Sequence, residues 1–203
     1  MTEPELWLQG RRITPDKIKC AEEVLEEILQ GADVFLSIRR HPLPEGGYVA
    51  KHVLVAVYRR LVDEGVLEDD PAVIARIRMK PTRTLSGVTT VTVLTGPHPC
   101  PGDCVFCPTD ERMPKSYLVD EPGAARAFQN KFDAFKQVNS RLEAYRAVGH
   151  PTDKIELLIL GGTWTFYPRD YQSEFIKRCF DAMNESESPD LLTAQQQIGR
   201  AHV

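Results

Sequence analysis

The chain has no long hydrophobic run and no recognisable secretory signal. Its longest strongly apolar stretch is IELLIL at 155–160, far shorter than the roughly 20 residues that a membrane-spanning helix needs. The first residues, MTEPELWLQG, are acidic and lack the apolar centre of a signal peptide. The sequence also has no internal repeat and no low-complexity tract. These absences argue against a membrane protein and predict a cytoplasmic one with no membrane partner.

An excess of positive charge is also missing, since 25 Lys and Arg stand against 29 Asp and Glu. This balance argues against a general nucleic-acid binder. The bases are nevertheless segregated, because residues 34–60 carry five bases and one acid, and residues 71–83 carry four bases and no acid. Such segregation produces either a basic face that suits RNA phosphates or a set of solvated helix faces. Charge alone leaves both interpretations open.

Cysteine is scarce, with five residues, yet three of them stand in GPHPCPGDCVFCPTD at 96–110. In a cytoplasmic protein thiols stay reduced, so metal binding explains this crowding better than a disulfide framework does. Three thiolates can hold three irons of a 4Fe–4S cluster and leave the fourth iron open to a ligand. The candidate ligands are Cys100, Cys104 and Cys107.

A structural zinc site is the alternative, and it would need a fourth ligand. The residues that could supply one are His98, Asp103 and Asp110. The two remaining cysteines, Cys20 and Cys179, fall on apolar helix faces and are expected to pack in the core.

Periodicity and capping residues predict an α/β protein with two parts. Three short amphipathic helices are expected within 14–31, 50–65 and 69–80, and they form a small helical N-terminal domain. The β-branched run at 88–94 predicts a strand and 123–149 predicts one long helix. The apolar run at 154–160 suits a buried parallel strand, and a further helix is expected near 170–184. Strand, loop and helix repeated in this order indicate βα units.

Two motifs follow the two predicted strands. The cysteine loop comes after the first strand, and Gly161, Gly162 and Thr163 come directly after the second. Parallel α/β folds bind ligands at the carboxyl ends of their strands, and glycines let the backbone approach a ligand closely. A pair of glycines by itself is more typical of a tight turn. Together with the cysteine loop, it indicates a ligand site at this edge.

The cysteine spacing, with Phe106 before the third cysteine, resembles the signature of the radical S-adenosylmethionine (SAM) superfamily. The longer stretch from MKPTRTLSGVTTVTVLTGPHPCPGDC to YQSEFIKRCFDAMN resembles the catalytic subunit of Elongator in its stand-alone bacterial and archaeal form. The likeness is continuous from about Arg78 to Asn184 and looser over the N-terminal helices. It implies a partial (β/α) radical SAM barrel and an acyltransferase-class enzyme. It implies that the enzyme forms 5-carboxymethyluridine at wobble uridine 34 of tRNA from acetyl-CoA.

The resemblance also implies cofactors and their ligands. A 4Fe–4S cluster on Cys100, Cys104 and Cys107 would cleave SAM to a radical that activates the acetyl methyl group. The residues implied for SAM are Phe106, Gly161, Gly162 and Thr163. Because Thr163 stands where the family has an acid, the contact there would use the backbone and the hydroxyl group.

Further roles follow from the same resemblance. Lys154 matches the family's acetyl-CoA contact, although a lysine before a strand is otherwise a solvating residue. Lys115 and Tyr117 are candidates for a cofactor or RNA contact. In a bacterium the stand-alone form would need no other Elongator subunits. The residues implied for tRNA are Arg39, Arg40, Lys51, Arg59, Arg60, Arg76, Arg78 and Lys80.

The chain departs from the family pattern toward its end. A full family member continues through more barrel strands and an acetyltransferase-like domain. We therefore expect a helical tRNA-binding region at 1–83, the start of an incomplete barrel at 84–195 and a non-native tail at 196–203. A chain with two barrel strands is expected to be inactive in isolation. A radical SAM enzyme with another substrate and a non-catalytic zinc or tRNA-binding module remain alternatives.

Overall fold

The computed structural model describes residues 12–198, and the chain divides into two compact units. The first unit comprises the residues up to Arg83 together with Arg146–His150. The second comprises Thr84–Tyr145 and the residues from Pro151 onward. Most of the tail expected at 196–203 lies outside the described residues. The division of roles, with tRNA binding before residue 84 and a barrel after it, stays a prediction.

The first unit is helical. Its elements are α2 (Pro15–Leu29), α3 (Val34–Arg40), α4 (Lys51–Asp63) and α5 (Pro71–Ile77), followed by the 3₁₀ turn η1 (Pro81–Thr84). The three predicted helices are α2, α4 and α5, whereas α3 was not predicted. Asp33 begins α3 by accepting hydrogen bonds from the N–H groups of Phe35 and Leu36, both at 3.0 Å. The core of this unit is built on Leu25, Ile28, Leu54, Tyr58 and Ile77, all buried.

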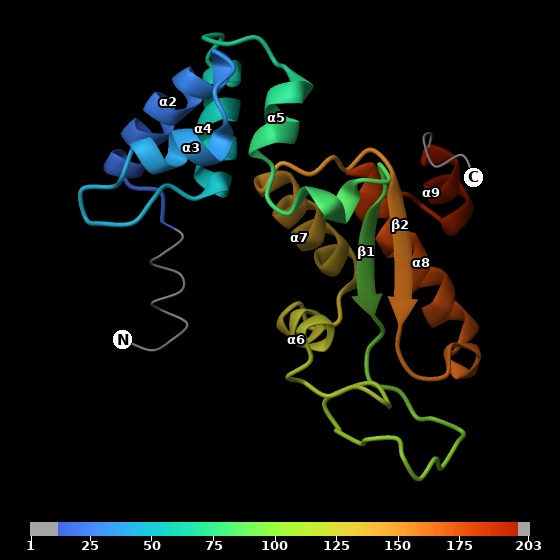
Figure 1. Ribbon diagram of the computed structural model, residues 1–203. Coiled ribbons are helices and arrows are strands. Elements are labelled where there is room, and N and C mark those ends of the chain that lie inside the picture. Colours follow the sequence, from blue (N-terminus) through green and yellow to red (C-terminus); the bar gives the residue numbers. More distant parts are fainter. Residues whose placement is uncertain (1–11, 199–203) are drawn as a thin grey trace. The chain divides into compact units, whose positions relative to one another are not determined.

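The second unit is a parallel βαβ arrangement. Its elements are β1 (Thr89–Leu94), α6 (Pro122–Gln129), α7 (Ala134–Ala147), β2 (Ile155–Leu160), η2 (Trp164–Phe166), α8 (Arg169–Asn184) and α9 (Leu191–Gln197). The two strands pair from Thr89 opposite Ile155 to Leu94 opposite Leu160. In Figure 1 both arrows point the same way, and the cysteine loop leaves the tip of β1. The predicted α/β class is confirmed.

The core of this unit lies on one face of the sheet. Val91 and Val93 of β1 pack there against Val138 of α7 and Phe175 of α8. The opposite face carries Leu158, which is 41% exposed. The expectation of a buried second strand is therefore wrong, because residues of β2 alternate between half-buried and exposed. Among the described residues, α7 and α8 cover a single face of the sheet.

The single long helix predicted over 123–149 is wrong, because α6 ends at Gln129 and α7 starts at Ala134. Lys131 and Phe132 adopt left-handed backbone angles, with φ of 53° and 56°. The N–H of Phe132 donates back to the carbonyl of Ala127 at 2.8 Å, which closes α6. Asp133 then caps α7 by accepting from the N–H of Lys136 at 2.9 Å. The helical spacing of apolar residues continues across this break, so the sequence pattern does not reveal it.

Within residues 12–198, no helix is both long enough and apolar enough to cross a membrane.

Candidate functional site: the cysteine loop and the carboxyl edge of the sheet

Two tyrosines hold the root of the cysteine loop. The hydroxyl of Tyr171 accepts a hydrogen bond from the N–H of Gly96 at 2.9 Å. The hydroxyl of Tyr167 donates to the carbonyl of Gly96 at 3.2 Å and accepts from Thr95 Oγ1 at 2.8 Å. Both polar groups of the Gly96 backbone are thereby tied to the segment that follows β2. Sequence reasoning missed these tyrosines, although YPRDY at 167–171, three residues after the Gly-Gly-Thr motif, was a usable signal.

Gly161 has no room for a side chain. A Cβ atom there would overlap Thr95 Oγ1 and lie 3.1 Å from Thr95 Cβ. Thr95 is fully buried, and its N–H donates to the carbonyl of Leu160 at 2.9 Å. Close approach of the two strand ends therefore explains the first glycine of the motif. At Gly162 the nearest atom to such a Cβ is Tyr167 Oη at 3.6 Å, followed by Lys115 Cβ at 3.8 Å.

The Gly-Gly-Thr motif meets the cysteine loop at the carboxyl ends of the strands. Thr163 Oγ1 lies 3.6 Å from Cys100 Sγ. Hydrogen bonds from the Gly102 backbone N–H, and then from the Thr163 hydroxyl, hold the pKa of the Cys100 thiol below its ordinary value. A thiol that ionises more readily is a better metal ligand.

The three predicted cluster ligands are gathered only in part. A side chain on Gly102 would meet Cys104 Sγ at 3.6 Å and Cys100 Sγ at 4.0 Å, so these two sulfurs face a common point. Cys107 Sγ instead contacts Ser116 Oγ at 2.7 Å. Residues 12–198 contain no group of three His, Cys, Asp or Glu side chains arranged to hold a metal ion. The donor chemistry thus suits an iron–sulfur cluster, whereas the arrangement brings together two of its three ligands.

Two of the three candidate fourth ligands of a zinc site, His98 and Asp110, have other contacts. His98 stacks on Tyr167, with ring centroids 4.7 Å apart. Asp110 accepts from Nε and from a terminal nitrogen of Arg112, at 2.9 and 2.7 Å. These bonds lower the pKa of Asp110 to about 2. A carboxylate paired in this way is a poor candidate for an additional metal ligand.

A hollow of about 430 Å³ lies beside Cys100. Its lining includes His98, Cys100, Asp110 and Lys115. Lys115 Nζ donates to Thr109 Oγ1 at 2.6 Å and so stands at the border between the loop and the Gly-Gly-Thr motif. The structure thus places one predicted cation next to the predicted cofactor residues.

Two other predicted contacts of this loop lie away from the hollow. Phe106 is 93% exposed at the loop and does not line the hollow. Tyr117 packs against the small cluster formed by Leu94, Met113, Ala124 and Ala127. Tyr117 therefore has a packing role in this cluster. Its contact with a cofactor or RNA stays a prediction.

Lys154 lies at the opposite end of the sheet. It directly precedes β2, its side chain is exposed, and its carbonyl accepts from the N–H of Thr89 at 2.9 Å. The cysteine loop and the Gly-Gly-Thr motif follow the carboxyl ends of the strands. At about 3.3 Å per residue, the length of β2 separates Lys154 from Gly161 by roughly 20 Å. The structure therefore does not bring Lys154 together with the cysteines.

Comparison with known proteins gives partial matches of high identity. The chain is 47% identical over 135 residues to a tRNA uridine(34) acetyltransferase of Methanocaldococcus infernus, covering 64% of this chain and 25% of that protein. It is 50% identical over 105 residues to the tRNA uridine(34) acetyltransferase of Dehalococcoides mccartyi, covering 52% and 23%. Elongator complex protein 3 of Drosophila melanogaster is 30% identical over 186 residues, covering 85% and 33%.

The resemblance to the Elongator catalytic subunit is confirmed. The chain spans about a quarter of the length of the first two of these relatives. A solved structure of the archaeal M. infernus Elp3 with an N-terminal deletion is 38% identical, with a TM-score of 0.40 over 55% of this chain and 19% of that one. No family model matches the chain.

Within this Elongator-like chain, several of the bases expected to bind tRNA make structural contacts. Arg76 donates to the carbonyl of Ile28 at 2.8 Å and thus caps the end of α2. Nε of Arg78 donates to the carbonyl of Gly149 at 2.7 Å. Nζ of Lys51 donates to the carbonyl of Arg76 at 3.1 Å. Truncation of these side chains would therefore disturb the helical unit as well as any RNA contact.

The remaining bases of the set are ion-paired or exposed. Arg40 pairs with Glu27 at 3.0 Å, and Arg60 pairs with Glu22 at 2.5 Å. Arg40 is nevertheless exposed, as are Arg39, Arg59 and Lys80. The guanidinium carbon of Arg39 lies 4.3 Å from the ring centroid of Phe35, itself 59% exposed. An exposed Arg–aromatic pair suits contact with RNA bases and phosphates.

Proposed function

We propose that this chain carries part of a tRNA wobble-uridine-modifying enzyme of the Elongator type, namely its helical RNA-binding region and the start of its radical SAM barrel. The observation that carries the proposal is the high identity to relatives named tRNA uridine(34) acetyltransferase. The assembly of the cysteine loop and the Gly-Gly-Thr motif at one sheet edge supports it. The substrate of this activity is the wobble uridine of tRNA, with acetyl-CoA as co-substrate.

Cys100, Cys104 and Cys107 would hold the 4Fe–4S cluster. When bound together with SAM, this cluster supplies the one-electron chemistry that produces a radical. Thr163 and the Gly102 N–H favour the thiolate form of Cys100, the form that binds metal. Gly162 lets the backbone approach a cofactor at the edge where Gly161 ends β2, and Lys115 offers a positive charge beside Gly162 for an anionic group.

The helical unit would bind tRNA through phosphate contacts. The exposed members of the predicted set are Arg39, Arg40, Arg59, Arg76 and Lys80. Of these, Arg40 is paired with Glu27 and Arg76 donates to the carbonyl of Ile28. Contacts of this kind give affinity and a strong dependence on salt, but no base readout. Lys154 would contact acetyl-CoA at the amino end of the sheet. A ligand that reaches both Lys154 and the cysteines must then extend along the length of β2.

The proposal is tested first by anaerobic reconstitution of this chain with iron and sulfide. We expect iron and sulfide in the ratio of one 4Fe–4S cluster per chain, with the brown absorbance of such a cluster. Cys104→Ala should abolish it. Cys20→Ser is the matched control, because Cys20 lies in the helical unit and donates to the carbonyl of His41, which a serine can also do.

Two further results decide between the proposal and its alternatives. Tight stoichiometric zinc with no uptake of iron would contradict the proposal and favour a zinc module. In the full-length parent protein, loss of uridine modification in Cys104→Ala with unchanged tRNA binding would support it. A parent protein that incorporates the cluster and cleaves SAM but leaves tRNA uridine unmodified would indicate another substrate.

A further inference from the structure

The second edge of β1 is covered by side chains of α7. Gln137 is buried, and it accepts from the N–H and donates to the carbonyl of Leu94, both at 2.9 Å. The hydroxyl of Tyr145 donates to the carbonyl of Thr90 at 3.0 Å. Successive residues of a strand turn their backbone groups to opposite edges, so Thr92, midway between Thr90 and Leu94, faces this same edge. Its backbone N–H is therefore directed toward α7, between two positions that α7 already binds.

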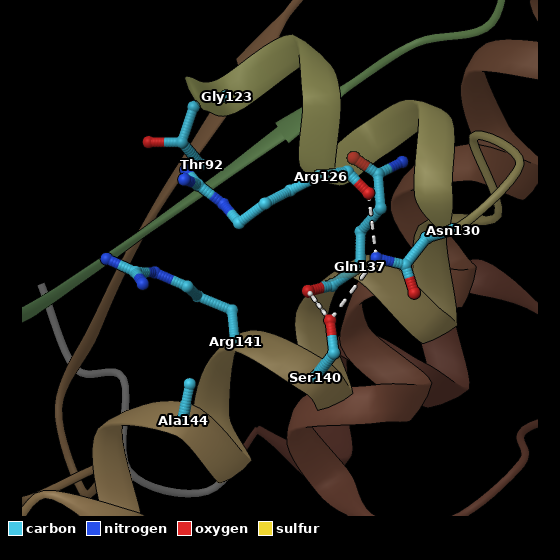
Figure 2. A pocket seen from close by; sticks show the side chains of 8 residues that line it. All are labelled: Thr92, Gly123, Arg126, Asn130, Gln137, Ser140, Arg141 and Ala144. Atoms are coloured by element: carbon cyan, nitrogen blue, oxygen red, sulfur yellow. Dashed lines mark hydrogen bonds between the residues drawn. The ribbon is translucent and has the colours of Figure 1, made fainter. Parts of the chain in front are cut away.

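A cavity of about 50 Å³ lies at this point, lined among others by Thr92, Gly123, Arg126, Ser140 and Arg141. One water needs about 10–15 Å³ of such space, so the cavity admits several atoms of that size. It can hold a tetrahedral oxyanion and is too small for a nucleobase. Figure 2 shows the guanidinium groups of Arg126, from α6, and Arg141, from α7, extending to the same side of it.

The charged residues that line the cavity are of one sign. None of the residues that line it is acidic, and two of them are arginines. Arg141 is held in place, since it donates to Tyr145 Oη at 2.9 Å and lies 4.2 Å from the ring centroid of Tyr145. Both guanidinium groups carry a positive charge, so an anion in the cavity would be attracted to them.

The start of α6 adds to the positive electrostatic potential at the cavity. Gly123 lines the cavity from the first turn of α6, and Glu121 before it makes no side-chain capping bond. The N–H groups of a first helical turn carry partial positive charge and favour anions. Ser140 completes the polar wall, with its hydroxyl donating to the carbonyl of Gln137 at 3.2 Å.

From the two arginines, the size of the cavity and the Thr92 edge, we infer that this cavity is a binding site for one phosphate group. Arg126 and Arg141 are its charged ligands, because a planar guanidinium group matches two phosphate oxygens at once. Phosphate occurs either as a diester in an RNA backbone or as a monoester in a small molecule. The site needs neither an iron–sulfur cluster nor uridine chemistry, so it does not depend on the proposed function.

The test is a titration of the whole chain with inorganic phosphate at constant ionic strength, followed through the Nε–H resonances of its arginines. The resonances of Arg126 and Arg141 should shift together and saturate, while that of Arg39 in the helical unit stays in place. Arg126→Gln and Arg141→Gln should each weaken binding about tenfold, as expected for loss of one charge-assisted contact. Lys136→Gln removes one charge from α7 outside the cavity and should leave the affinity unchanged.

Arg141→Lys separates charge from packing, because it keeps the cation and loses the planar group, so intermediate binding is expected. Thermal unfolding of each variant verifies that the chain is folded. Shifts that do not saturate, or equal weakening in Lys136→Gln, would overturn the inference and leave water as the occupant. Displacement of phosphate by an RNA trinucleotide without a terminal phosphate identifies a backbone diester as the ligand. Displacement of phosphate by glycerol 3-phosphate alone identifies a monoester as the ligand. If neither compound displaces phosphate, the inference is overturned.

Discussion

Gly161→Ala tests the contact that joins the two strand ends beneath the cysteine loop. The added methyl group would overlap Thr95 Oγ1, so either Thr95 or the end of β2 must move. Overpacking of a rigid core costs about 1–3 kcal/mol. Turning Thr95 away also breaks its buried hydrogen bond to Tyr167, which costs about 1–3 kcal/mol more. We therefore expect Gly161→Ala to lower the free energy of unfolding by about 2–6 kcal/mol.

The neighbouring glycine supplies the control. In Gly162→Ala the new methyl group meets Tyr167 Oη at 3.6 Å, an ordinary contact. Neither glycine has a positive φ, so replacement by alanine is not strained at either position. The change at Gly162 should therefore stay within about 1 kcal/mol.

Urea unfolding, followed by the fluorescence of Trp164 in a Trp7→Phe background, measures both variants. Trp164 is a suitable reporter because its ring centroid lies 5.9 Å from that of Tyr167. In a Thr95→Ala background the cost of Gly161→Ala should shrink, because the overlapping hydroxyl is gone. Equal stability of Gly161→Ala and Gly162→Ala would refute the close approach of Thr95.

Four further outcomes follow from the remaining sites. Arg39→Glu should weaken binding to all tRNAs alike in filter-binding assays at several salt concentrations. Arg76→Ala should instead lower the unfolding temperature, because it removes the cap of α2. Binding that does not depend on salt would count against the phosphate contacts. In the full-length parent protein, Lys154→Ala should keep its iron and lose about tenfold in uridine modification if one charged contact to acetyl-CoA is lost, and full activity would leave Lys154 a solvating residue. By NMR, Asp110 should titrate near its pKa of about 2, and at a higher pH in Arg112→Gln, which loses the guanidinium group but keeps the bond from the backbone N–H of residue 112. Because this pKa is lowered, the contribution of the pair to the stability of the fold is complete above pH 3.8 and is lost as the pH falls toward 2. A titration midpoint near 3.8 in the unchanged chain would disprove the pairing.

Local chemistry determined much of this protein from its sequence alone. Thr14 with Pro15 and Asp70 with Pro71 mark the starts of α2 and α5, because capping needs only residues close along the chain. The order of strands and helices predicted parallel βα units, and strand direction then placed the cysteine loop and Gly161 at one edge. The cysteine spacing suggested metal chemistry without reference to any fold.

Other features depend on residues distant in the chain and appeared only in the structure. The break between α6 and α7 rests on two left-handed residues, Lys131 and Phe132, whose side chains fit the helical pattern. Packing between elements decides that Arg76 caps α2 and that Gln137 covers an edge of β1. Periodicity along a chain records which face of an element is apolar, but it does not record which polar groups meet across a fold. Only tertiary structure decided those partners, because each buried polar group must find a hydrogen bond wherever the packing leaves one.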